Sequence, residues 1–159
     1  FYKVFHNMRE NIANALKEAL KAKDQVALST MRLIVAALKD RDIAARVNDN
    51  PDGISDEEIL GMLQTMIKQR SESAKMYRDG DRPELAANEE AEIEIIKNFL
   101  PTQLSAVEME RAITKAIAET GAGSIKDMGQ VMGYLKAHFA GQMDFSSASQ
   151  DVKAALMAK

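Results

Sequence analysis

Hydrophobic residues recur every three or four positions along most of the chain, a spacing typical of amphipathic helices. Pro, Gly and Asp clusters interrupt the pattern and separate the first four predicted helices, which span 8–23, 25–46, 55–77 and 83–99. Asp24 and Ser55 stand where N-terminal caps are expected, and Glu58 would complete a capping box with Ser55. The predicted buried faces include Leu20 in the first helix and Ile43 in the second, and the first pair should form an αα-hairpin.

Pro101 lies in the sequence FLPTQLS and marks the clearest boundary in the chain, because proline disfavours a helical residue before it. Beyond it, Ser105 and Glu108 have capping-box spacing, and three shorter helices are predicted over 105–120, from 124 or 127 to about 140, and over about 146–158. No segment alternates as a strand does. The prediction is an all-α protein with a helical N-terminal domain of about four helices (8–100) and a three-helix C-terminal domain (101–159), whereas residues 1–7 break the pattern and are interpreted as an extension.

Composition supports helix packing. The 159 residues are 46% hydrophobic and only 5% aromatic, with no Trp. The absence of Cys excludes disulfides, thiolate metal sites and Cys nucleophiles, and it agrees with a reducing cytosol. The opening residues do not have the pattern of a signal peptide, and no apolar run approaches the roughly 20 residues that cross a bilayer. A cytoplasmic protein is therefore expected.

The net charge of −3 is unevenly distributed. Residues 1–50 have nine Lys or Arg against six Asp or Glu (+3), 51–103 have six against twelve (−6), and 104–159 have six against six. A protein that binds nucleic acid by charge alone shows a basic stripe, and this chain has none. Contact with RNA would have to be local and led by shape, and neither DNA nor a membrane is expected as a partner.

Motifs for catalysis or metal binding are missing. No glycine-rich phosphate loop occurs, and Ser146 and Ser147 are interpreted as helix caps rather than nucleophiles. His6 and His138 have no partner at ligand spacing, and the acidic run at 89–94 is interpreted as solvated or paired with the preceding helix. No catalytic residue, metal or cofactor is expected.

Two arginines have both a structural and a binding interpretation. Arg70 is predicted to pair with Glu89 or Glu92 on the next helix, and the alternative is an exposed groove that recognises a partner. Arg32 lies between apolar positions, so its stem is predicted to pack and its charged end to pair.

Two glycines one turn apart, Gly129 and Gly133, interrupt the helical sequence DMGQVMGYLK at a cost of about 1 kcal/mol each. Close packing against a neighbouring helix is the favoured explanation, and contact with a sugar-phosphate chain is the alternative. Lys126 and Lys136 flank the pair. If Asp127 caps this helix, the amides of residues 128–130 would face outward as a phosphate site, although the charge of Asp127 would weaken it.

The ordered stretches TMRLIVAALKDRDI, MIKQRSESAKMY, EEAEIEIIKNFLPTQLS and DMGQVMGYLK resemble the YqeY-like family, whose members are stand-alone relatives of the tail of the GatB subunit of glutamine-dependent tRNA amidotransferase. The resemblance covers nearly everything after residue 8. It implies two helical domains and a tail that lies against tRNA. It also implies carbon–nitrogen ligase activity with glutamine as amido-N-donor, a label that comes from the whole complex, whose catalytic parts have no counterpart here.

The resemblance thus implies a non-catalytic accessory module that binds tRNA or a tRNA–enzyme complex. GatB tails have a similar GQVM segment, which residues 129–132 match in this chain. Gln142 stands where relatives often have a basic residue. A helical protein–protein adaptor without RNA affinity is the alternative, and a component of a carbon–nitrogen ligase is a second one. The candidate tRNA-binding residues are Lys126, Gly129, Gln130, Gly133 and Lys136.

Overall fold

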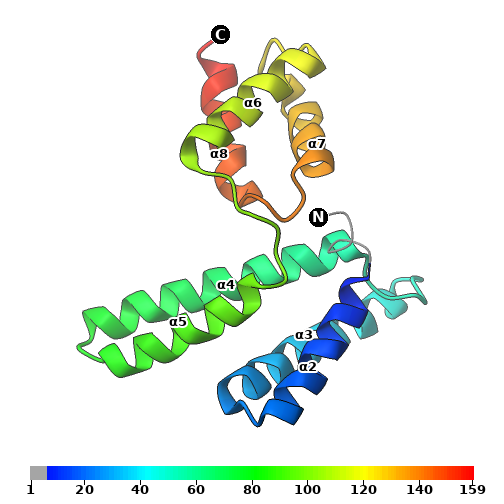
Figure 1. Cartoon of the computed structure of the whole chain (residues 1–159). Helices are drawn as coiled ribbons and strands as arrows, with labels where there is room; N and C mark the ends of the chain where they lie inside the picture. Colours follow the sequence, from blue (N-terminus) through cyan, green and yellow to red (C-terminus); the bar gives the residue numbers. More distant parts are fainter. Residues whose placement is uncertain (1–6) are drawn as a thin grey trace. The chain divides into compact units, whose positions relative to one another are not determined.

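The computed structural model describes residues 7–159, which form seven α-helices and one short 3₁₀ helix with no strand in that range (Figure 1). The predicted all-α class is confirmed. Most of the predicted extension, including His6, lies outside the described residues. In the part of the chain that is described, no helix is long and apolar enough to span a membrane.

The chain divides into two compact units, Phe1–Pro101 and Thr102–Lys159. A domain folds by itself, whereas these units are defined by their internal contacts. The division into domains 8–100 and 101–159 therefore stays a prediction.

The first unit consists of two helical hairpins (Figure 1). Helix α2 packs along α3, which confirms the predicted αα-hairpin, and α4 packs along α5. Their bounds are Met8–Ala22, Gln25–Val47, Asp56–Asp79 and Pro83–Lys97. The helices meet over an apolar core whose most buried members include Met8, Ile12, Met31, Ile34, Ile59, Leu63 and Ile96.

The predicted caps hold in most places. Asp24 accepts a hydrogen bond from the Ala27 N–H at 3.1 Å and starts α3. Ser55 accepts one from the Glu58 N–H at 3.2 Å and starts α4. The Glu58 carboxylate, however, accepts from the Ser55 hydroxyl at 3.3 Å rather than closing the predicted box through the backbone.

Two predicted core residues, Leu20 and Ile43, are 50% and 49% exposed. At roughly 100° per residue, Leu20 lies a full step beyond the buried Ala19, at the edge of the stripe that α2 presents to its neighbours. Ile43 lies on the side of α3 opposite the buried residues Ile34 and Leu38. The Leu20 prediction was wrong because three- and four-residue spacing defines a stripe but not its width. The Ile43 prediction was wrong because Ile43 follows Leu38 by five positions and so leaves that stripe.

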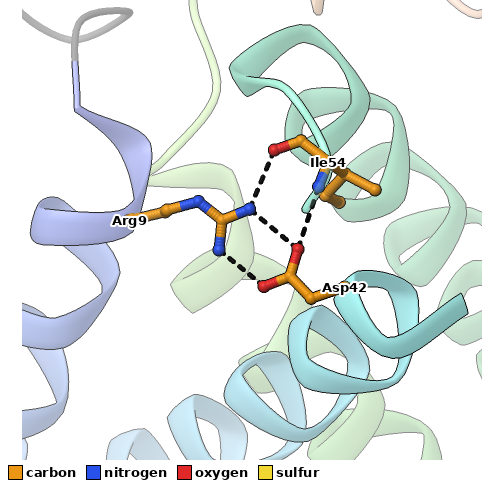
Figure 2. A network of polar contacts seen from close by, with 3 residues as sticks. All are labelled: Arg9, Asp42 and Ile54. Carbon is orange, nitrogen blue, oxygen red and sulfur yellow. Dashed lines mark hydrogen bonds and ion pairs between the residues drawn. The ribbon is translucent and has the colours of Figure 1, made fainter. Parts of the chain in front are cut away.

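Arg9 of α2 joins three segments of the first unit (Figure 2). Its two terminal nitrogens donate to the two carboxylate oxygens of Asp42 on α3 at 2.6 and 2.8 Å, and one of them also donates to the Ile54 carbonyl at 2.8 Å. The Ile54 N–H in turn donates to Asp42 at 3.0 Å. Chiefly because of the Arg9 bond, the pKa of Asp42 falls from its usual 3.8 to about 2. This network fixes the loop between α3 and α4 and was not foreseen.

Helices α4 and α5 are joined by ion pairs. Arg70 donates to Glu92 at 2.8 Å, with 13% and 25% of the two side chains exposed, which confirms the predicted pair. Arg78 adds a more exposed pair with Glu90 at 2.5 Å. Arg32 is exposed and makes no ion pair with any residue in 7–159, so its predicted packing was wrong: it lies on the exposed side of α3, whereas its neighbour Met31 is buried.

The second unit packs three helices around a small core. They are α6 (Ala106–Thr120), α7 (Met128–His138) and α8 (Phe145–Met157), with the 3₁₀ helix η1 (Ile125–Asp127) directly before α7. The predicted box at Ser105 and Glu108 starts α6. Residues at the centre of the core include Ile113, Ala116, Val131, Leu135, Val152 and Leu156.

The start of α8 differs from the prediction. Asp144 is the cap and accepts a hydrogen bond from the Ser146 N–H at 3.0 Å, so Ser146 and Ser147 lie inside the first turn. A carboxylate two residues earlier already satisfies the first free N–H, which leaves no capping position for the serines. The preceding loop is held by the Leu104 N–H, which donates to the Gln142 carbonyl at 2.9 Å.

Candidate nucleic-acid interface

Helix α7 has one face in the core and one face in solvent. Val131 and Leu135 are fully buried, whereas Gly129 and Gly133 are exposed on the other side. A Cβ atom built on either glycine would meet no described atom within 4 Å. The favoured explanation from sequence, close packing against a neighbouring helix, is therefore wrong within the second unit, because α6 and α8 contact the opposite face of α7.

Exposed polar residues surround this open face. Lys136 follows Gly129 by seven positions and Gly133 by three, so all three share one side of α7. Lys126 precedes them in η1, and Gln130 lies on the flank; all three polar side chains are exposed. Neither lysine makes an ion pair with a residue in 7–159. We call the surface formed by these five candidate residues the glycine face.

The start of α7 does not form the predicted phosphate site. The Asp127 carboxylate does not cap α7 but turns back, accepting from the N–H groups of Gly123 at 2.9 Å and Ser124 at 3.2 Å. These two bonds, the Gly123 bond first, lower the pKa of Asp127. The Met128 N–H donates to the Ile125 carbonyl. The 3₁₀ turn thus uses one of the three N–H groups that were predicted to face outward, and the Asp127 carboxylate lies beside the helix start.

An aromatic pair lies at the other end of α7. The rings of Tyr134 and His138 are stacked, with their centroids 4.0 Å apart and their planes 19° from parallel. His138 Nδ1 lies 2.9 Å from the Tyr134 carbonyl oxygen, which only accepts, so the contact is a hydrogen bond when Nδ1 is protonated. In the sequence, this pair was indicated by the four-residue spacing of Tyr134 and His138, which places both rings on one side of a helix. Among the described residues, no group of three or more His, Cys, Asp or Glu side chains could hold a metal ion.

The glycine face is suited to close contact with another molecule. Without side chains at two successive turns, the α7 backbone is accessible to a flat or extended partner, and the lysines supply positive charge at both ends. The described residues around it include no nucleophile and base at hydrogen-bonding distance from each other.

Comparison with known protein families shows to which family the chain belongs. The family model described as Yqey-like protein matches residues 9–156, which include both hairpins of the first unit and the glycine face. This chain belongs to the YqeY-like family. The match covers more than nine-tenths of the sequence, so membership rests on both units rather than on one motif.

Several curated proteins from yeasts are similar to part of the chain. The chain is 32% identical over 90 residues to a Lachancea thermotolerans protein, covering 57% of this chain and 46% of that one. It is 33% identical over 86 residues to a Vanderwaltozyma polyspora protein, covering 54% and 44%, and 27% identical over 97 residues to a Candida glabrata protein, covering 61% and 52%. Each relative is named altered inheritance of mitochondria protein 41, mitochondrial. The chain thus spans about half the length of these relatives.

Proposed function

We propose that the chain is a non-catalytic accessory module that binds tRNA, or a tRNA–enzyme complex, through the glycine face. The observation that carries the proposal is the open space over Gly129 and Gly133. Gly133 lies in the interior of α7, where glycine costs about 1 kcal/mol relative to alanine, and Gly129 lies in the first turn. Neither obtains packing in return within the unit, so a contact outside it is the physical reason to keep them.

Charge supports RNA as the occupant. Lys126 and Lys136 flank the open backbone, and each is free of ion pairs with described residues. Two phosphate contacts are few, so binding should be modest, with a salt dependence of about −2 in log affinity against log salt concentration. Gln130 provides both a hydrogen-bond donor and an acceptor for a sugar or a base.

Titration of the protein with total tRNA across a salt series tests the proposal. Lys126→Glu and Lys136→Glu should each weaken binding, and each should lower the magnitude of the salt slope by about one. Lys153→Glu is the matched control, because it makes the same charge change at an exposed position on α8. A protein that shifts no tRNA at low salt, or loses affinity equally in the control, would contradict the proposal.

The adaptor alternative predicts no tRNA complex at any salt concentration. A separate groove between α6 and α8 supports it. The ligase alternative requires this chain to act within a larger amidotransferase assembly. Purified protein given glutamine and ATP should release no ammonia, and release that depends on an identifiable side chain would contradict the proposal of a non-catalytic module. We expect a cytoplasmic location, whereas the names of the yeast relatives assign those proteins to mitochondria.

A further inference from the structure

A groove opens between α6 and α8 of the second unit, lined by none of the five residues of the glycine face. Its volume is about 610 Å³, within the range of sites that hold ligands. The floor is apolar: Ile113 is only 5% exposed, and Met109 and Ala155 are partly buried against the core. The remaining lining residues are Ala106, Glu110, Thr114, Ser147 and Asp151.

Acidic groups stand on both walls of this groove. Glu110 projects from α6 and Asp151 from α8, and no basic residue lines the space between them. Both are exposed, and neither makes an ion pair with a residue in 7–159. The groove therefore combines an apolar floor with two unneutralised carboxylates.

We infer that this groove docks a basic amphipathic helix of a partner protein. A helix laid between α6 and α8 would bury an apolar side chain on Ile113, while Lys or Arg one turn away on either side would reach Glu110 and Asp151. RNA does not fit the same surface, because its phosphates would face two carboxylates. The inference does not rest on tRNA binding and gives the module a second, separate surface.

Two synthetic peptides of equal length provide the probe. Both have a leucine stripe, flanked by lysines in one and by glutamates in the other. Fluorescence anisotropy with the full chain should show binding of the lysine peptide and not of the glutamate peptide. Glu110→Lys should weaken the lysine peptide about fivefold to tenfold, because it replaces an attraction by a repulsion. Glu110→Lys combined with Asp151→Lys should reverse the preference between the two peptides.

Glu119→Lys is the matched control, because it makes the same charge change at an exposed position of α6 that does not line the groove. Glu110→Gln removes the charge with little change in shape, and it should bind the lysine peptide with an intermediate affinity. This variant keeps the test valid if Glu110→Lys misfolds. An equal loss of affinity for the lysine peptide in the Glu119→Lys control, or no loss of that affinity in Glu110→Lys, would overturn the inference. A dimer of the free protein that Glu110→Lys dissociates would also overturn it, because a second copy would then occupy the groove.

Discussion

In the first unit, Arg9, Arg70 and Arg78 each form an ion pair that joins two helices. In the second unit, none of the six Lys and Arg residues makes an ion pair with a described residue, and α7 has an open backbone face. Three arginines of the first unit thus pair between its helices, whereas no such pair occurs among the described residues of the second unit, where Lys159 instead donates to the Ala122 carbonyl at 3.0 Å. In the described part of the chain, ion pairs between helices therefore contribute to the stability of the first unit only, and the proposed tRNA contact lies in the unit that lacks them.

Gly53 of the first unit and Gly133 of the second differ in the same way, although Gly61 in α4 of the first unit is as open as Gly133. Gly53 in the first unit has φ +82°, and a Cβ there would lie 2.3 Å from an Asp42 carboxylate oxygen, so backbone conformation and space both require glycine. Gly133 in the second unit meets neither requirement. The fold explains why position 53 is glycine, whereas it does not explain why position 133 is.

The largest expected effect tests whether the two units are separate. Leu135→Ala removes a fully buried side chain from the core of the second unit and should cost about 3 kcal/mol of unfolding free energy. Hydrogen exchange should show faster exchange in α6, α7 and α8, with α2–α5 unchanged. Loss of protection in all seven helices would mean that the units unfold together and would break the comparison.

The next effect concerns the Arg9–Asp42–Ile54 network. Asp42→Asn removes a charged acceptor and should cost about 2 kcal/mol at neutral pH. The pKa of Asp42 is about 2 in the folded protein and 3.8 ordinarily, so its contribution is complete above pH 3.8 and is lost as pH falls toward 2.

Chemical denaturation at a series of pH values measures this contribution. The wild type should lose stability over that window more steeply than Asp42→Asn. Parallel curves for the two proteins would show that Asp42 titrates normally and that the first unit does not depend on this network.

The smallest expected effect is that of Gly133→Ala, which is compared with Gly53→Ala. Gly53→Ala should destabilise the protein by at least about 2 kcal/mol, because of its left-handed backbone and because the added methyl group would displace the Asp42 carboxylate. Gly133→Ala should stabilise it by roughly 0.5–1 kcal/mol because the added methyl group meets nothing. Thermal unfolding of both variants measures the signs. Weaker tRNA binding by Gly133→Ala would support the proposed contact, because the same methyl group would then stabilise the fold and obstruct the partner. Destabilisation of the protein by Gly133→Ala would instead show that Gly133 is packed.

Helices and most caps were predictable because they depend on neighbours in sequence. Asp24, Ser55 and Ser105 each start a helix as their spacing predicted. The caps at the end of the chain were less predictable, because Asp127 and Asp144 compete with nearby serines and short loops decide which group reaches the free N–H. The candidate residues on α7 were also named from sequence, but their exposure was not.

The sequence by itself determined the all-α class, the order of the helices and the set of residues on each helix face, because hydrogen bonds and side-chain periodicity within a helix are local. Only the tertiary structure decided which faces are covered. Arg9 meets Asp42 and Ile54 across 33 and 45 residues, and Gly129 and Gly133 stay open because α6 and α8 pack on the other side of α7. Contacts of that range depend on how helices pack, which no local pattern specifies.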